Sequence, residues 1–313
     1  MVKVWLTAGL CFMALHALGE DLTLHSRRVL VFDSDTGETL YAKAADTPAP
    51  IASVTKLMTA MVTLDEKPDL EELLTVTADD VDTLKNSRSR LAVGTRLTRR
   101  DMLHLALMSS ENRAAHVLAR TSLQGLPEFV ASMNRKAQVF GMQHTQFVDP
   151  TGLSPDNLST AADLALLARQ AARYGPIGEF TTTPFDSVLV RGSRLLYRNS
   201  NPMVGRQGWD VWLSKTGFIN EAGSCMVVGF RAGGRNLAVV LLGAGSKAAR
   251  QEDLVRVRNW ATGVRTIAPA GARARGARVS GKAGVRDGAN LKKIRHGGPP
   301  RGPKKATKHR TAV

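Results

Sequence analysis

The chain has 313 residues, of which 43% are hydrophobic and 22% are charged, and its formal net charge at pH 7 is +16. These are globular proportions, which exclude a wholly disordered chain. The charge is concentrated at one end. Residues 265–313 hold fourteen Lys or Arg and one acid, so the rest of the chain has a net charge of only +3.

The N-terminal residues have the pattern of an export signal. Lys3 precedes an apolar run over residues 4–18, and the small residues Ala17 and Gly19 close it. This pattern predicts a secretory signal over residues 1–19, cut before residue 20. An uncleaved membrane anchor is the alternative, although the run is shorter than the ~20 residues that span a bilayer. Cleavage would leave Cys225 as the single cysteine, which we expect to be buried in a strand.

Strands are predicted near both ends of the body. Residues 28–32 and 39–42 flank a turn-forming segment with Gly37, which suits a positive φ, and this pattern predicts a β-hairpin. Three more strands, joined by turns that contain glycine, are predicted over residues 211–217, 224–231 and 235–243. We expect all five strands to share one antiparallel sheet that is built from both ends of the chain.

The middle of the chain is predicted to be helical. Thr98 and Asp101 have the spacing of a helix cap, and Gly141 and Gly175 stand where two helices would end. The expected helices cover residues 53–64, 98–108, a segment starting near residue 112, 126–140 and 159–175.

A closing helix is predicted over residues 248–261, with one apolar face made of Leu254, Val257 and Trp260. The fold class is therefore α/β (α+β), an antiparallel sheet flanked by helices with an all-helical lobe beside it. We expect one domain over residues 20–263, because this length is enough for one large domain or two intimately joined lobes.

The C-terminal residues 264–313 are predicted to form a disordered basic tail. They are rich in Ala, Gly and Pro and contain few large apolar residues, so they cannot bury enough surface to fold alone. Such a tail suits attachment to a polyanion, namely an anionic membrane, lipopolysaccharide or an acidic wall polymer. Export argues against nucleic acid as the partner. A solvated tail without a dedicated partner is the alternative.

Ser53-Val54-Thr55-Lys56 is the first of three short motifs that carry chemistry. Ser53 lies at a predicted helix start, where free N–H groups and a partial positive charge favour an oxyanion. Lys56 lies about one helical turn further, so both side chains face the same way. Desolvation and the charge of Lys215 would lower the pKa of Lys56. We therefore predict Ser53 as nucleophile and Lys56 as general base, although the pair alone would indicate a helix cap and a solvated lysine.

Ser110-Glu111-Asn112 is the second motif, at the predicted junction of two helices. Asn112 can hold a substrate amide and Lys56 together, because its side chain both donates and accepts hydrogen bonds. Ser110 can relay a proton to a leaving amine, and Glu111 is expected to point away. A plain helix cap is the alternative.

Lys215-Thr216-Gly217 is the third motif, at the end of a predicted strand. A strand at a sheet edge can pair with an extended peptide, and Gly217 would let the peptide backbone approach. Lys215 and Thr216 offer a charge and a hydroxyl to a carboxylate. The N–H groups of Phe218 and Ser53 are the expected oxyanion hole. An ordinary strand end is the alternative.

These three motifs in this order resemble the low-molecular-mass penicillin-binding proteins, the serine D-alanyl-D-alanine peptidases, over about residues 25–263. Segments 86–91, 108–115, 150–154 and 216–223 are most similar to the periplasmic D-alanyl-D-alanine endopeptidase subgroup. The resemblance implies a transpeptidase/β-lactamase-like fold, a Ser53 acyl-enzyme, no cofactor and a periplasmic location. It further implies hydrolysis of peptide cross-links in peptidoglycan and covalent acylation by β-lactams.

Two departures from the family pattern bear on the substrate. No β-rich second domain follows the catalytic body, which favours an endopeptidase over a carboxypeptidase that trims stem pentapeptides. The basic tail has no counterpart in that pattern, so a polyanion- or wall-binding protein with weak catalysis is a further alternative.

Other enzyme classes fit the sequence less well. A class A β-lactamase needs a Glu in a Glu-x-x-Leu-Asn context, and neither Glu128 nor Glu179 has it. A Ser-His-Asp hydrolase needs a motif histidine, whereas His104, His116 and His144 are expected to pack or to be solvated. No ligand pattern supports a metal site.

Overall fold

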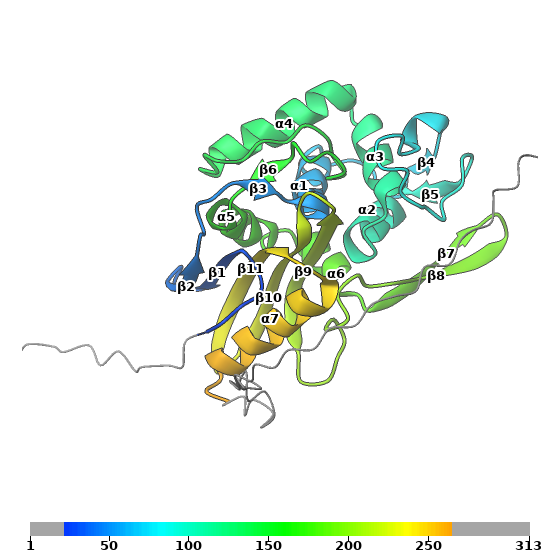
Figure 1. Ribbon diagram of the computed structural model, residues 1–313. Coiled ribbons are helices and arrows are strands. Elements are labelled where there is room, and N and C mark those ends of the chain that lie inside the picture. Colours follow the sequence, from blue (N-terminus) through cyan, green and yellow to red (C-terminus); the bar gives the residue numbers. More distant parts are fainter. Residues whose placement is uncertain (1–21, 265–313) are drawn as a thin grey trace, which may run out of the picture. The chain divides into compact units, whose positions relative to one another are not determined.

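In the computed structural model, which describes residues 22–264, the centre of the protein is a five-stranded antiparallel sheet (Figure 1). Its order is β2-β1-β11-β10-β9, so the first strand of the chain pairs directly with the last. The predicted strands, the early hairpin and the shared sheet are confirmed. The strands are β1 (Arg28–Asp33), β2 (Thr39–Lys43), β9 (Asp210–Ile219), β10 (Gly223–Ala232) and β11 (Arg235–Ala244).

The sheet is buried on both faces, which explains the long apolar runs of its central strands. Along β11, side chains alternate between two separate hydrophobic cores: Val240 and Leu242 face the helical lobe, and Val239 and Leu241 face the last helix. That last helix, α7 (Lys247–Ala261), lies across the second face (Figure 1). Its predicted apolar face is confirmed, with Leu254, Val257 and Trp260 all packed into that core.

The helical lobe is arranged around α1, which is buried along most of its length. A helix that is apolar nearly all round must be surrounded, and α1 contacts α2, α3, α4, α5 and α6. The Thr98 hydroxyl accepts a hydrogen bond from the Asp101 N–H at 3.0 Å, so the predicted cap is confirmed. The helices of the lobe are α1 (Lys56–Asp65), α2 (Arg99–Met108), α3 (Asn112–Arg120), α4 (Gly125–Val139), α5 (Ala161–Ala171) and α6 (Gly175–Thr182).

The single helix predicted over residues 159–175 is wrong at both ends. Ser159 belongs to the short strand β6 (Leu158–Ser159), and α5 begins after Thr160, whose hydroxyl accepts from the Asp163 N–H at 3.0 Å. Gly175 starts α6, with a proline in its first turn, and does not end α5. Proline is favoured in the first turn of a helix because it has no N–H to leave unpaired there.

A second hairpin was not predicted. It consists of β7 (Phe185–Val190) and β8 (Ser193–Arg198), and Figure 1 shows it extending away from the body. Its two turn residues, Arg191 and Gly192, have φ values of 49° and 80°, which match the twist of a tight hairpin. Arginine is uncommon at a positive φ, so the sequence carries only a weak turn signal here. Two further strand pairs are short: β3 (Ala49–Pro50) with β6, and β4 (Leu73–Thr75) with β5 (Arg96–Thr98).

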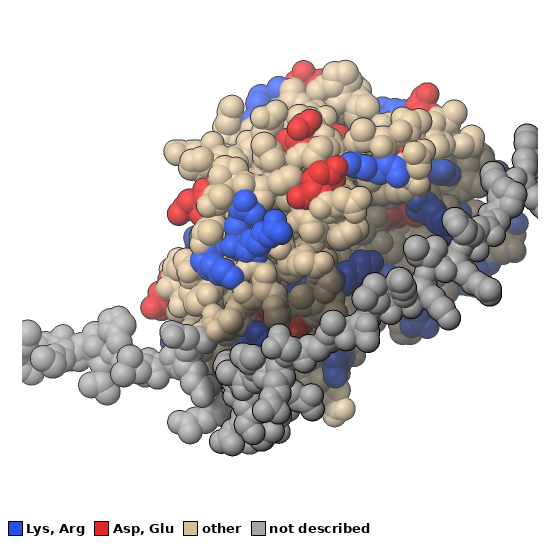
Figure 2. Space-filling view, in the orientation of Figure 1, with Lys and Arg blue, Asp and Glu red and all other residues tan. Residues whose placement is uncertain are grey.

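The predicted signal and basic tail lie outside the described residues, apart from residue 264. Basic and acidic side chains are interspersed on the face of the body in Figure 2, consistent with the small net charge of residues 1–264. Within residues 22–264, no helix has the length and apolarity needed to cross a membrane. Cys225 is buried in β10 as predicted, and burial raises its pKa to about 11, which keeps the thiol protonated.

Candidate active site

Ser53 lies in a short 3-10 turn, η1 (Ala52–Thr55), that joins β3 to α1. The predicted helix over residues 53–64 is therefore split, and the α-helix proper begins at Lys56. Ala52, directly before the serine, has a φ of 49°, which costs free energy for a residue with a side chain. The turn is held in this shape by the Thr55 hydroxyl, which donates to the Ala52 carbonyl at 2.8 Å.

The Lys56 ammonium lies at the centre of the site. Its Nζ is 2.9 Å from Ser53 Oγ, 2.7 Å from Asn112 Oδ1 and 2.6 Å from the Thr151 carbonyl oxygen. Two of these three partners can only accept. A neutral amine has two N–H bonds and one lone pair, so both N–H bonds can go to the carbonyl oxygens of Asn112 and Thr151. The lone pair is then directed at the Ser53 hydroxyl, which is the geometry of a general base.

The burial of Lys56 supplies the change in acidity that a lysine base needs. The side chain is 1% exposed, and burial lowers its pKa from 10.5 to about 7. The carboxylates of Asp149, Glu111 and Asp82 oppose this shift by favouring the charged form. Of the two causes expected from the sequence, desolvation and the charge of Lys215, desolvation is the dominant one in the structure.

Lys215 and Ser110 form a second contact across the site. The Lys215 side chain is fully buried in β9, and its Nζ donates to Ser110 Oγ at 2.8 Å and to the Thr216 carbonyl oxygen at 2.9 Å. Burial, then the charges of Lys56 and Arg250, hold the pKa of Lys215 well below its usual range. Ser110 has a φ of 65°, so the junction of α2 and α3 is strained at the residue that faces Lys215.

Asn112 links Lys56 to the segment before α2. Its Oδ1 accepts from Lys56, and its Nδ2 donates to Ser87 Oγ at 2.9 Å. Ser87 is held in turn by Asp82, whose carboxylate accepts from the Ser87 N–H at 2.8 Å. No role for Ser87 is predicted from the sequence, where its only signal is the family resemblance of segment 86–91. The expectation that Glu111 points away is wrong, because its carboxylate accepts from the Arg113 N–H and lines a cavity beside the motif.

The Thr151 carbonyl was also missed, because a backbone acceptor has no residue-type signal. It is placed by Asp149, whose carboxylate accepts from three backbone N–H groups of the turn: those of Thr151 at 2.6 Å, Gly152 at 2.8 Å and Ser154 at 2.9 Å. The Asp-Pro-Thr-Gly sequence is a turn signal that could have located this loop. Gly152 has a φ of 79°, and a Cβ there would lie 2.0 Å from the Ala52 carbonyl oxygen.

Thr216, Gly217 and Phe218 lie on β9, which is an edge strand of the main sheet, so it has an edge not paired within that sheet. A Cβ on Gly217 would lie 2.9 Å from the Ile51 carbonyl oxygen and 3.0 Å from Ser53 N. The glycine thus allows close approach of the turn that holds Ser53, a reason that differs from the substrate approach expected from the sequence. Thr216 is buried, whereas Phe218 is half exposed.

The histidines of the Ser-His-Asp alternative lie elsewhere. His104 stacks on Phe180, and His116 Nδ1 is 2.8 Å from a carboxylate oxygen of Asp80. His144 is exposed. None of the three is hydrogen-bonded to Ser53 among the described residues.

A family model described as D-alanyl-D-alanine carboxypeptidase, peptidase S11, matches residues 15–246. The chain belongs to this family. It is 43% identical to a D-alanyl-D-alanine endopeptidase of Pseudomonas aeruginosa over 254 residues, 80% of this chain and 82% of the relative. It is 40% identical to a D-alanyl-D-alanine endopeptidase of Escherichia coli K12 over 237 residues, 75% of this chain and 76% of the relative.

Solved structures agree with the S11 assignment. The Streptomyces K15 DD-transpeptidase is 27% identical, with a TM-score of 0.72 over 77% of this chain and 98% of that chain. A D-alanyl-D-alanine carboxypeptidase of Mycobacterium tuberculosis is 25% identical, with a TM-score of 0.71 over 80% and 96%. The predicted transpeptidase-like fold and the assignment to the serine D-Ala-D-Ala peptidases are therefore confirmed.

The lowered pKa of Lys56 generates a prediction about pH. A base with a pKa of about 7 is neutral above that pH and charged below it, so acylation of the enzyme should accelerate as pH rises. We expect the second-order rate constant for acylation by a fluorescent penicillin to fall about tenfold for each pH unit below 7 and to level off above 8. Circular dichroism at each pH controls for unfolding. A midpoint near 10 would contradict the assignment of a buried lysine base.

Proposed function

We propose that this S11 peptidase is a D-alanyl-D-alanine endopeptidase that hydrolyses peptide cross-links of peptidoglycan through an acyl-enzyme on Ser53. The observation that carries the proposal is the position of Lys56 Nζ, which lies 2.9 Å from Ser53 Oγ and within hydrogen-bond distance of the carbonyl oxygens of Asn112 and Thr151. The names of the two relatives at 43% and 40% identity support the endopeptidase activity.

Acylation begins with proton transfer from Ser53 Oγ to neutral Lys56. The oxygen attacks the carbonyl carbon of a D-alanyl residue, and the N–H groups of Ser53 and Phe218 stabilise the oxyanion that forms. Asn112 orients the amide of the substrate, and Thr216 and Gly217 on the edge strand pair with its extended backbone.

Ser110 gives its hydroxyl proton to the nitrogen of the leaving amine and takes up in turn the proton that Lys56 removed from Ser53, so Lys56 becomes neutral again; Ser110 Oγ lies 2.8 Å from Lys215 Nζ. The C–N bond breaks, the amine departs protonated, and the D-alanyl group remains on Ser53 as an ester. Water then attacks the ester with Lys56 again as base, which releases the acid and restores the serine. A β-lactam would acylate Ser53 by the same route, but its opened ring stays attached to the acyl group, so we expect slow release.

The proposed activity predicts the fate of cross-linked muropeptide dimers. The wild-type protein should convert dimers to monomers, and Ser53→Ala should reduce the rate at least 1,000-fold, because the residual activity of such variants comes only from binding and the oxyanion hole. Mass spectrometry of the products measures both. Ser122→Ala, at a buried serine outside the site, is the matched control and should retain activity.

The same assay separates endopeptidase from carboxypeptidase activity. Dimers that stay intact while stem pentapeptides lose their terminal D-alanine would contradict the cross-link proposal and favour the carboxypeptidase. Rapid, repeated hydrolysis of nitrocefin would favour a β-lactamase instead.

We further propose a role for each end of the chain. Residues 1–19 act as an export signal, residues 20–263 form the peptidase domain in the periplasm, and residues 264–313 attach the protein to an anionic membrane or wall polymer. The charge of +13 over residues 265–313 supports the attachment. N-terminal sequencing of the exported protein would contradict the signal if residue 1 were retained.

The basic tail generates a prediction about binding. Deletion of residues 265–313 should leave acylation by a penicillin unchanged and weaken binding to sacculi and to anionic vesicles in a sedimentation assay. The loss should be largest at low salt, because ions screen the attraction between exposed charges. Equal binding of the full-length and truncated proteins at low salt would contradict the proposal.

A further inference from the structure

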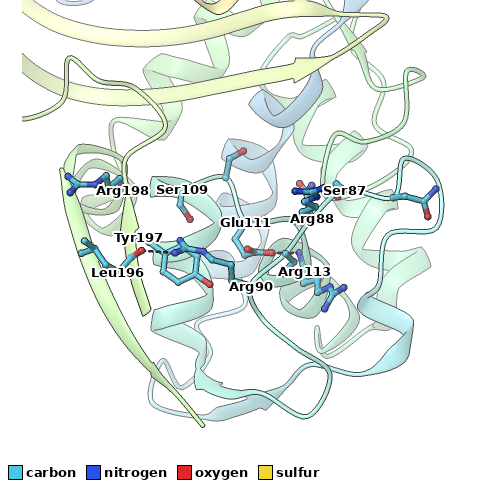
Figure 3. Close-up of a pocket in the computed structure, with 13 residues that line it drawn as sticks. Ser87, Arg88, Arg90, Ser109, Glu111, Arg113, Leu196, Tyr197 and Arg198 are labelled. Atoms are coloured by element: carbon cyan, nitrogen blue, oxygen red, sulfur yellow. Dashed lines mark hydrogen bonds between the residues drawn. The ribbon is translucent and has the colours of Figure 1, made fainter. Parts of the chain in front are cut away.

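A cavity of about 860 Å³ opens beside Ser110 and Asn112 (Figure 3). Three parts of the chain line it: residues 86–90, the α2–α3 junction over residues 109–113, and residues 196–198 of β8. This volume is in the range of pockets that hold a ligand of some tens of atoms. It is much larger than a single amino acid requires.

The cavity is lined by four arginines whose charge is not neutralised by ion pairs. None of Arg88, Arg90, Arg113 and Arg198 forms a salt bridge with any described residue. Arg88 and Arg198 are exposed and donate no side-chain hydrogen bond within residues 22–264. In Figure 3 these two lie on either side of the residues from the second motif. Clustered arginines without carboxylate partners form a strong site for carboxylates, since the guanidinium can bind both oxygens at once.

Two of the arginines are held in place by the protein. Arg90 stacks on the ring of Tyr197, with its guanidinium carbon 3.6 Å from the ring centre, and donates to the Leu196 carbonyl oxygen at 2.7 Å. Arg113 donates to the Leu91 carbonyl oxygen at 2.7 Å, and its buried Nε has no partner. Tyr197 is 2% exposed. Arginines fixed before binding lose less side-chain entropy when an anion arrives.

Glu111 is the single acid that lines the cavity. Its carboxylate already accepts a hydrogen bond from the backbone N–H of Arg113. The lining therefore carries a net charge of +3. The charge and the volume together point to an anionic ligand with more than one carboxylate.

We propose that this cationic pocket binds the carboxylates of the peptide that leaves when a cross-link is cut. The inference rests on the proposed function, because Ser110, the proposed donor to the leaving amine, is part of the pocket wall. The leaving group of a carboxypeptidase is one D-alanine with a single carboxylate. The leaving group of an endopeptidase is a peptide with several, which matches the pocket in size and charge.

A pair of double variants tests the proposal on the full chain. Arg88→Gln/Arg198→Gln removes two exposed charges from the pocket, and Arg96→Gln/Arg194→Gln removes two exposed arginines outside it as the matched control. We expect the pocket variant to lose about tenfold in kcat/KM for muropeptide dimers at low salt, and the control to change less than about twofold. Acylation by a penicillin, which lacks the leaving peptide, should fall much less. Arg88→Lys/Arg198→Lys should recover part of the loss.

A binding measurement separates this inference from the proposed function. The monomeric muropeptide released from a dimer, and the same peptide with amidated carboxylates, are titrated into Ser53→Ala by calorimetry. We expect the amidated peptide and the Arg88→Gln/Arg198→Gln background each to weaken binding about tenfold, without an additive effect. If dimers are not cleaved but this pattern appears, the proposed function fails and the pocket stands. If dimers are cleaved equally by both double variants, or amidation has no effect on binding, the pocket proposal is overturned.

Discussion

The site depends on one constraint, which is the burial of the Lys56 amine against two carbonyl oxygens. Lys56 begins α1, a helix buried along most of its length, and is itself only 1% exposed, so its pKa falls to about 7. The Asn112 and Thr151 oxygens then fix which way the lone pair points. Asp149 holds the Thr151 loop and Ser87 holds Asn112. Residues far apart in the sequence therefore fix the two oxygens that surround Lys56 Nζ.

The fold places strain where the chemistry is proposed to occur. Ala52 and Ser110 both have a positive φ, and each lies at a bend that brings a motif serine close to a buried lysine. Gly152 and Gly217 have no side chain at two places where their backbone lies close to the turn that holds Ser53. A buried core on both faces of the sheet supplies the stability that offsets such local strain.

Much of this organisation could be predicted from the sequence, because it is local. The spacing of Ser53 and Lys56, the capped start of α2 and the alternation of the strands all follow from short-range rules. The Thr151 carbonyl could not be predicted, because a backbone oxygen carries no residue signal. The β7–β8 hairpin was missed because its turn has Arg191 where asparagine would be usual. The arginine pocket joins three distant segments, which no spacing rule brings together.

The most direct test of this account is the titration of Lys56 itself. Carbon-13 NMR of the lysine ε-carbons, with Lys56→Arg used to assign the signal, reports the protonation of each amine as pH is raised. We expect the Lys56 signal to titrate with a midpoint near 7, and Asp149→Asn to move this midpoint downward, because the Asp149 charge raises the pKa of Lys56. A midpoint near the ordinary lysine value of 10.5 would contradict the claim that burial prepares Lys56 as the base.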